Sequence, residues 1–178
     1  MPKNIYFSGQ NLTLTEIANY YRSVQDAIYY YFDKHHNLNN FLLYTIEEIE
    51  NEKIKILDEL EKNCVFMVLT SLEASFRIDY LQRCLFYKYK DPISKKFRTL
   101  YKKYEERVSL EDEILKTWKD YNEREIKNTL CKLIEAFKYR HWLAHGRYWK
   151  PKLGSKIYDF SSVYILAKFI YENLEFYI

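Results

Sequence analysis

The sequence predicts an all-α fold, a single domain over residues 1–178 in which five to seven helices form one bundle. Only three glycines and three prolines interrupt 178 residues, so long uninterrupted elements are expected. Charged residues make up 30% of the chain, and apolar residues recur three and four positions apart, which is the helical period. The 19 tyrosines favour strands by intrinsic preference, but the periodicity outweighs them.

The first helix is expected to begin after Thr13, because Thr13 and Glu16 form a capping box. Apolar residues then recur at helical spacing as far as Tyr31, and the polar stretch DKHHNLNN ends the helix. A second helical segment is predicted from about Phe41 to Glu61. Glu and Lys lie three and four positions apart on its exposed face, which supports a helix weakly.

The third segment begins at Cys64 and is the most apolar of the chain, so it is expected at the centre of the bundle. Its apolar stripe consists of Val65, Val68, Leu69, Leu72, Phe76 and Tyr80. Asp91-Pro92 is expected to end it, because proline disfavours the helical conformation of the residue before it. After Pro92, the stretch ISKKFRTLYKKY predicts a short helix in which basic and apolar residues are interleaved.

Ser109 and Asp112 are expected to open another helix, which restarts at Asn122 and Glu125 after a bend. The restarted helix would bury an apolar side formed by Ile126, Leu130, Leu133, Ile134 and Phe137.

Gly146 is the expected left-handed residue that closes this helix. A loop of about a dozen residues follows it. The last helix is then predicted to begin at a cap formed by Asp159 or Ser161 and to end at Tyr177.

Composition narrows the setting of the protein. Cys64, Cys84 and Cys131 are far apart and form no CxxC pair, so we expect reduced thiols in a cytoplasmic protein. The N-terminal residues lack the apolar run of a signal peptide, and no stretch approaches the roughly 18 apolar residues that a membrane span needs. The net charge of +3 does not identify a polyanionic partner, so the position of the charge matters more than its sum. No cofactor is implied.

The stretch FKYRHWLAHGRYWKPKLGSK, residues 137–156, holds two of the four histidines and two of the three tryptophans. Arg140 and His145 are five positions apart, which places them about 140° apart on an ideal helix. They would converge only if the last turn distorts before Gly146. An imidazole moves protons near neutral pH and a guanidinium neutralises a phosphate, so the two groups suit phosphodiester chemistry.

The segment Arg140-His141-Trp142-Leu143-Ala144-His145 resembles the R-x(4–6)-H motif of the HEPN superfamily (higher eukaryotes and prokaryotes nucleotide-binding). The wider stretch RHWLAHG is similar to the form that this motif takes in many bacterial members. The resemblance implies an HEPN-like helical bundle and a metal-independent endoribonuclease, with Arg140 and His145 as the catalytic pair. His141 fills the position after the arginine, where the family commonly has a polar residue.

The same resemblance implies a homodimer in which the two motif copies meet in one cleft. It suggests a toxin or an antiviral defence component, so a cognate antitoxin or defence-system protein is a candidate partner. Toxins of the family that a nucleotidyltransferase antitoxin controls have a tyrosine two positions after the histidine. Here Tyr148 comes three positions after His145, so that type of regulation does not follow.

The loop after Gly146 combines basic and aromatic residues and contains no acid as far as Tyr158. Basic groups contact phosphates while aromatic rings stack on unpaired bases, so the loop is a candidate RNA-binding segment. The expected RNA-binding residues are Arg147, Tyr148, Trp149, Lys150, Lys152 and Lys156. The alternative is a solvated loop in which Trp149 closes one end of the bundle.

On the third segment, Glu73 and Arg77 form an i, i+4 pair that would either lie on the surface or orient the catalytic arginine. His141 and His145 also have the spacing of two zinc ligands on one helix face, but no acidic or Cys ligand is near them in the sequence. The other histidine pair, His35-His36, is predicted in a polar turn.

Three alternatives to a nuclease remain at this point. The arginine and histidine can simply cap the end of a helix. A non-catalytic HEPN module would bind RNA or a protein partner without cutting. A helical domain with a purely structural role has the same pattern of helices.

Overall fold

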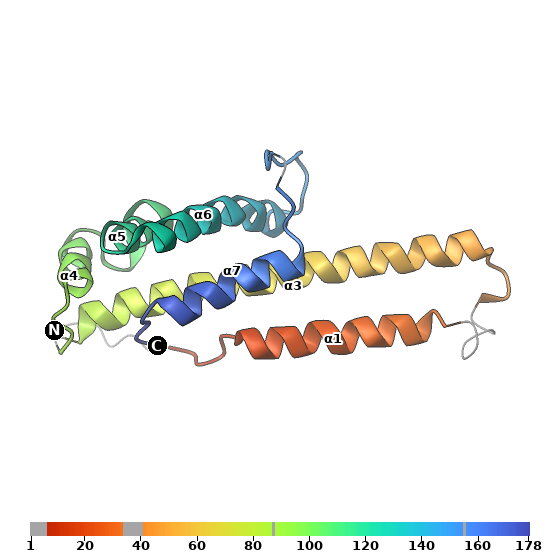
Figure 1. Cartoon of the computed structure of the whole chain (residues 1–178), viewed down its shortest axis with the longest axis horizontal. Helices are drawn as coiled ribbons and strands as arrows, with labels where there is room; N and C mark the ends of the chain where they lie inside the picture. The colour runs from red at the N-terminus through yellow and green to blue at the C-terminus, as the bar shows by residue number, and fades with distance from the viewer. Residues whose placement is uncertain (1–6, 34–40, 87, 155) are drawn as a thin grey trace.

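The computed structural model describes residues 7–33, 41–86, 88–154 and 156–178, and every regular element within them is helical (Figure 1). The predicted all-α bundle is confirmed, with six α-helices among the described residues. The elements are α1 (Leu14–Tyr31), α3 (Ile46–Leu85), α4 (Pro92–Tyr104), the 3₁₀ turn η2 (Glu105–Arg107), the π-helical η3 (Leu110–Leu115), α5 (Lys116–Asp120), α6 (Arg124–Ala144) and α7 (Phe160–Asn173). No helix in these residues combines the length and the apolar character needed to cross a membrane.

Helix α3 is the axis of the bundle and corrects one expectation. The two segments predicted from Phe41 to Glu61 and from Cys64 onward are one helix of 40 residues, because no glycine or proline separates them. It begins at Thr45, whose capping box with Glu48 the sequence analysis did not predict. At 1.5 Å per residue the helix is about 60 Å long.

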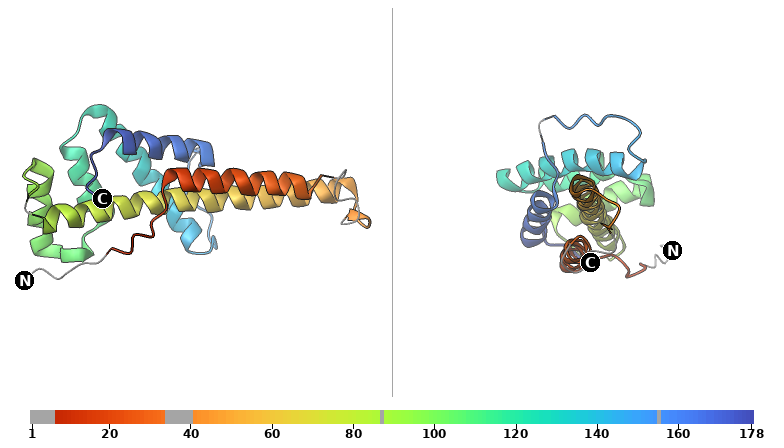
Figure 2. Two further views of the ribbon diagram at one scale, coloured as in Figure 1. Left: turned by 90° about the horizontal axis from the view of Figure 1, so that it is seen from below. Right: turned by 90° about the vertical axis from the view of Figure 1, so that its right-hand side faces the viewer.

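The first half of α3 pairs with α1, and together they form a two-helix arm that extends beyond the other helices (Figure 2). Helix α1 begins at the predicted capping box between Thr13 and Glu16. Glu61, near the middle of α3, accepts hydrogen bonds from the Tyr21 hydroxyl (2.7 Å) and from the backbone N–H of Phe160. The Tyr21 and Phe160 rings stack 4.2 Å apart, so this carboxylate joins α1 and the start of α7 to α3.

The second half of α3 lies in the core, where α4, α6 and α7 pack around it (Figures 1 and 2). The predicted apolar stripe is buried, and none of its six side chains is more than 1% exposed. Helix α4 begins at Pro92 itself, directly before the predicted stretch, and buries Phe97 and Leu100. Helix α3 already ends at Leu85, before the predicted break at Asp91-Pro92. Of the three cysteines, Cys64 and Cys84 are buried, Cys131 is exposed, and all three are free thiols.

The segment between α4 and α6 differs in detail from its prediction. Ser109 caps η3 by accepting the backbone N–H of Asp112 (3.2 Å), as expected. The restart after the bend has Glu123 as its N-cap rather than Asn122, whose side-chain amide instead donates to the Trp118 carbonyl (2.7 Å). This hydrogen bond directs the Asn122 side chain back toward α5 and away from the start of α6.

Helix α7 begins at the predicted cap Asp159 but ends at Asn173, four residues before the predicted end. The residues after it turn away because their backbone groups bind α3 instead of continuing the helix. The Tyr177 N–H donates to the Asp79 carboxylate (2.9 Å), and the Glu175 carbonyl accepts from Arg83 (2.6 Å). A periodic sequence pattern does not register such long-range acceptors and donors.

Asp79 and Arg83 form a buried ion pair, with 0% and 3% of their side chains exposed. The Arg83 guanidinium also binds Asp91 (3.0 Å), the N-cap of α4, and its carbon lies 4.1 Å from the centre of the Tyr177 ring. The Tyr89 ring stacks on that of Tyr177 at 3.8 Å. One arginine therefore connects the end of α3, the start of α4 and the C-terminal tail.

Candidate functional site

The site is built around the C-terminal end of α6, where the helix closes as predicted at Gly146. Gly146 has φ +75° and Arg147 has φ +59°, both left-handed. The backbone N–H of Arg147 donates to the carbonyl of Trp142 (3.2 Å), which is the bond that defines a Schellman motif. A Cβ atom at Gly146 would meet nothing within 4 Å, so glycine is favoured there by backbone conformation alone.

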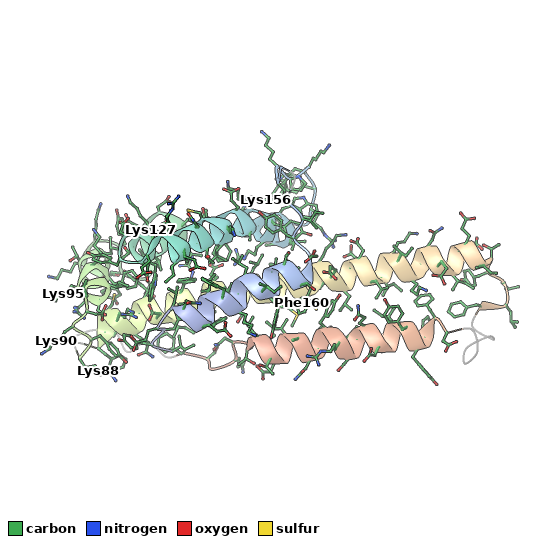
Figure 3. All side chains as sticks on the ribbon, in the orientation of Figure 1. Lys88, Lys90, Lys95, Lys127, Lys156 and Phe160 are labelled. Atoms are coloured by element: carbon green, nitrogen blue, oxygen red, sulfur yellow. The ribbon has the colours of Figure 1, made fainter. Side chains whose placement is uncertain are left out.

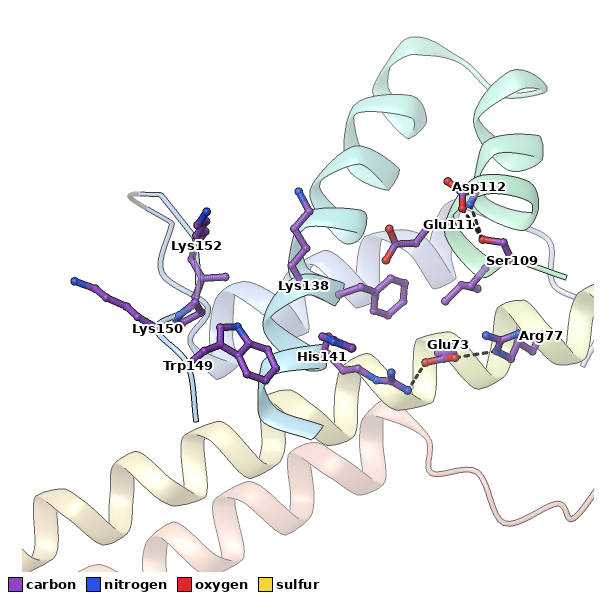
Figure 4. A pocket seen from close by; sticks show the side chains of 15 residues that line it. Glu73, Arg77, Ser109, Glu111, Asp112, Lys138, His141, Trp149, Lys150 and Lys152 are labelled. Atoms are coloured by element: carbon purple, nitrogen blue, oxygen red, sulfur yellow. Dashed lines mark hydrogen bonds and ion pairs between the residues drawn. The ribbon is translucent and has the colours of Figure 1, made fainter. Parts of the chain in front are cut away.

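A pocket of about 740 Å³ opens between α3, the start of η3, α6 and the loop after Gly146 (Figure 4). Five permanent cations and three carboxylates line it, so its charge is positive by two at neutral pH, with histidine neutral. The cations are Arg77, Lys138, Arg140, Lys150 and Lys152, and the carboxylates are Glu73, Glu111 and Asp112. Phe137, Trp149, Leu110 and Leu153 supply apolar wall.

Glu73 binds two guanidiniums at this pocket. It accepts a hydrogen bond from Arg77 Nε (2.8 Å) and forms an ion pair with Arg140 Nη2 (Figure 4). The side chain of Glu73 is 16% exposed, that of Arg140 29% and that of Arg77 41%. The buried Nε of Arg140 has no hydrogen-bond partner among the described residues. The predicted Glu73–Arg77 pair is present, and the same carboxylate contacts the arginine of the motif.

The two motif histidines differ in position. His141 lines the pocket beside Arg140, whereas His145 is exposed at the C-cap of α6 and is not among the residues that line it. Their rings are 4.2 Å apart between centroids, so His145 lies one helical turn beyond His141 at the rim. The pocket thus joins Arg140 to His141, and the pair expected from the sequence, Arg140 and His145, does not share it.

The loop after Gly146 is held against the helix by Trp149. Its carbonyl accepts the indole N–H of Trp142 (2.6 Å), and its ring centroid lies 5.9 Å from that of His141 and 6.3 Å from that of His145. Trp149 is half-buried and lines the pocket together with Lys150. It therefore forms part of the wall around the histidines and does not insert into the bundle.

The predicted RNA-binding residues separate into three groups. Lys150 and Lys152 line the pocket with Trp149. Tyr148 is 85% exposed, with its ring 4.6 Å from that of Trp149.

The remaining two basic residues of the loop lie elsewhere. Arg147 donates to Glu59 on α3 (2.7 Å), which lowers the pKa of that carboxyl and ties the loop to the arm. Lys156 lies beside Lys132 on another part of the surface, lining a separate hollow.

The wall formed by Glu111 and Asp112, with Ser109 beside them, was not predicted as part of the site. Burial raises the pKa of the Glu111 carboxyl, and the neighbouring Asp112 adds to the effect. The Ser109 hydroxyl donates to the Asp112 carboxylate (2.9 Å). The capping pattern predicted that a helix begins here, but only the packing of η3 against α3 places that beginning at the pocket.

In the part of the chain that the structure describes, His141 and His145 have no third side chain beside them that would complete a zinc site. No group of three or more His, Cys, Asp or Glu side chains suited to a metal occurs among those residues. His35 and His36 lie outside the described residues.

Comparison of the chain with protein-family models, with curated proteins and with solved structures found no match. Two guanidiniums and the two pocket-lining loop lysines form a cationic surface suited to phosphate. The His141 imidazole lies beside it, as does the Glu111 carboxyl, whose pKa is raised by burial.

Proposed function

We propose that this chain is a metal-independent endoribonuclease of the HEPN type that cleaves RNA with Arg140, His141 and His145. The main support is the pocket that brings the Arg140 guanidinium and the His141 imidazole together under a loop of basic and aromatic residues. The HEPN-like motif adds support, because Arg140 is its arginine and its histidine, His145, lies at the rim of the pocket beside His141. Each member of the site has the chemistry that phosphodiester cleavage needs.

In the proposed reaction the ribose 2′-oxygen attacks the adjacent phosphorus. A P–O2′ bond forms, the P–O5′ bond breaks, and the products are a 2′,3′-cyclic phosphate and a 5′-hydroxyl. One imidazole takes the proton from the 2′-hydroxyl, and a second proton donor protonates the leaving 5′-oxygen. Arg140 stabilises the additional negative charge on the phosphate oxygens, and its position is set by Glu73.

The distance between the two histidines supports a dimer. Attack and departure occur on opposite sides of the phosphorus, whereas the rings of His141 and His145 are neighbours 4.2 Å apart at one helix end. Both imidazoles of one chain would therefore approach a phosphate bound in the pocket from the same side. A second copy across a two-fold axis would supply the group for the other side, and the exposed His145 and Tyr148 are at the surface where it would bind.

The proposal includes a cytoplasmic setting as a toxin or an antiviral defence component. A cognate antitoxin or another defence protein would then restrain the nuclease. These points rest on the motif alone.

The test is incubation of purified protein with total cellular RNA, with and without EDTA. We expect cleavage that EDTA does not affect, products that end in a cyclic phosphate, and no stoichiometric zinc by elemental analysis. Zinc at one per chain that is lost in His141→Ala would instead support the HxxxH metal alternative.

A non-catalytic RNA-binding module is the second candidate, and the ion pair between Glu73 and Arg140 favours it. The carboxylate offsets part of the positive charge that would stabilise a transition state. Under this alternative the protein binds RNA through Trp149, Lys150 and Lys152 but cuts none in either condition.

A further inference from the structure

The basic end of the molecule consists of Lys88 and Lys90, in the connection before α4, and Lys95 and Lys96 on α4 (Figure 3). All four lysines are exposed and none lines the pocket described above. Between residues 86 and 104 the sequence has seven basic residues and one acid, Asp91. Residues 86–104 are therefore strongly basic, although the net charge of the whole chain is only +3.

The single acid of this region does not neutralise the lysines. Asp91 accepts the backbone N–H of Ser94 (2.9 Å) and the guanidinium of Arg83 (3.0 Å), so its carboxylate faces the α3–α4 junction. Lys90, Lys95 and Lys96 form no ion pair with any residue that the structure describes. Their charges are available to a ligand.

The connection that bears Lys88 and Lys90 is held in place by stacking. The Tyr89 ring stacks on Tyr177 at 3.8 Å, and Tyr177 covers the Arg83 guanidinium. Lys88 lies over the Tyr89 ring, with its nitrogen 4.9 Å from the ring centre. These contacts present the lysines beside α4 at little entropic cost.

The opposite end of the molecule has the opposite charge. Residues 46–62 of α3 contain seven acids and three lysines, and they belong to the arm. A polyanion would therefore be repelled from the arm and attracted toward α4.

We propose that the basic end is a second RNA-binding site, which holds the phosphate backbone of a substrate strand outside the pocket. The proposal rests on the proposed function for the identity of the ligand as RNA. Glu73 and Arg83 are ten residues apart on α3, so the pocket and the basic end are separated by about 15 Å along the helix axis. An RNA strand of several nucleotides would reach from the pocket to the basic end, whereas a trinucleotide bound in the pocket would not.

A backbone contact fits this surface better than an anionic membrane. The apolar face of α4 is used by the core, where Phe97 is 0% and Leu100 7% exposed, so it has no apolar side to insert between lipids. The four exposed lysines present mobile positive charge, which is the character of a phosphate-backbone contact.

The test compares two triple variants with the same change of net charge, both in a His145→Ala background that prevents cleavage. One is Lys90→Gln, Lys95→Gln, Lys96→Gln. The matched control is Lys53→Gln, Lys55→Gln, Lys127→Gln, in which two lysines lie on the acidic arm and one on the outer face of α6. Binding of a long single-stranded RNA and of a trinucleotide is measured by fluorescence anisotropy over a range of salt concentrations.

For the long RNA we expect the first triple variant to raise the Kd about tenfold or more and to lower the slope of log K against log salt by about 2, while the control changes neither. Trinucleotide binding should be the same in both. A first variant that matches the control on long RNA, or a parent protein that binds no RNA, would overturn the inference. So would binding to phosphatidylserine vesicles that depends on these lysines while RNA binding does not.

The outcomes separate this inference from the proposed nuclease. Loss of long-RNA binding in the first variant, with no cleavage by the wild-type protein, would retain the basic end as an RNA site and reject the nuclease. Cleavage by the wild-type protein, with long-RNA binding unchanged in the first variant, would support the nuclease and reject the basic end as an RNA site.

Discussion

Glu73 on α3 and Arg140 on α6 form an ion pair across the floor of the pocket, although they are far apart in the sequence. The same carboxylate also binds Arg77 one turn further along α3. Glu73 therefore sets the direction of the guanidinium that we propose to stabilise the transition state. The Nε atom of Arg140 has no hydrogen-bond partner in the described residues, so the ion pair with Glu73 is the polar contact that orients the Arg140 guanidinium.

Glu73→Gln should lower kcat for RNA cleavage at least tenfold with little change in KM, because the guanidinium loses the charge that positions it. Exposed and partly exposed pairs contribute about 1 kcal/mol or less, so the free energy of unfolding should change little. Glu50→Gln, which removes a carboxylate paired with Lys53 at 2.6 Å on the arm, away from the pocket, is the matched control and should leave kcat unchanged. Equal effects of the two substitutions would exclude a positioning role for Glu73.

His141→Ala and His145→Ala should each reduce cleavage about a hundredfold or more, the usual contribution of a general acid or base. Arg140→Ala should do the same by removing charge stabilisation. Both histidines are exposed, so their loss should change the free energy of unfolding by less than about 1 kcal/mol. Single-turnover cleavage rates and urea denaturation of each variant provide the measurement, with Lys132→Ala on the same helix as control. A His145→Ala protein that cuts RNA at the wild-type rate would contradict the assignment.

Light scattering at micromolar concentration should find a dimer, because the two imidazoles of one chain are neighbours at one helix end and the proposed reaction uses groups on opposite sides of the phosphate. Specific activity should fall on dilution below the dissociation constant. Mixing inactive Arg140→Ala with inactive His145→Ala protein should restore part of the activity, because a mixed dimer retains one intact residue of each kind in the shared cleft. A monomer with full specific activity, or mixtures that stay inactive although mixed dimers form, would reject the shared cleft.

The stability of the protein should depend on pH through Asp79. Burial raises the pKa of this carboxyl from 3.8 to about 6 despite its contact with Arg83. Between these two values the native chain binds more protons than the unfolded chain, so this group makes the free energy of unfolding decrease as pH rises, by on the order of 3 kcal/mol.

Asp79→Asn should remove that dependence, since Arg83 retains Asp91 as a charged partner. Urea denaturation of both proteins at intervals from pH 4 to pH 7 measures the difference. If the wild type instead gains stability relative to Asp79→Asn over this range, attraction to Arg83 outweighs the cost of burial.

Local interactions explain what the sequence predicted well. The capping box of α1, the start of α4 at the Asp91-Pro92 step and the left-handed closure at Gly146 each involve residues a few positions apart. Hydrogen-bond geometry and backbone conformation within one turn determine them, so the residue types suffice. The buried stripe of α3 was predictable for the same reason, because a period of 3.6 residues determines which side chains share a face.

The errors in element boundaries have non-local or competing causes. Helix α7 ends at Asn173 and not at the predicted Tyr177, because Asp79 and Arg83 bind the backbone of the C-terminal tail. The N-cap of α6 is Glu123 and not the predicted Asn122, because the Asn122 side chain binds the Trp118 carbonyl at the end of α5. The tail contacts join residues far apart in the sequence, so no local window contains them, whereas the Asn122–Trp118 hydrogen bond is local and competes with the predicted cap.

By itself the sequence determined the helical class, the buried face of α3 and the helix end that bears Arg140, His141 and His145, since each depends on short-range periodicity and capping. Only the tertiary structure decided which side chains share the pocket. It placed Arg140 and His141 inside, His145 at the rim, Arg147 on Glu59 of α3, and Glu111 on the opposite wall. The physical reason is that these contacts depend on how α3, η3 and α6 pack together, and that packing is decided by burial of apolar area over the whole chain, not by the spacing of residues within one helix.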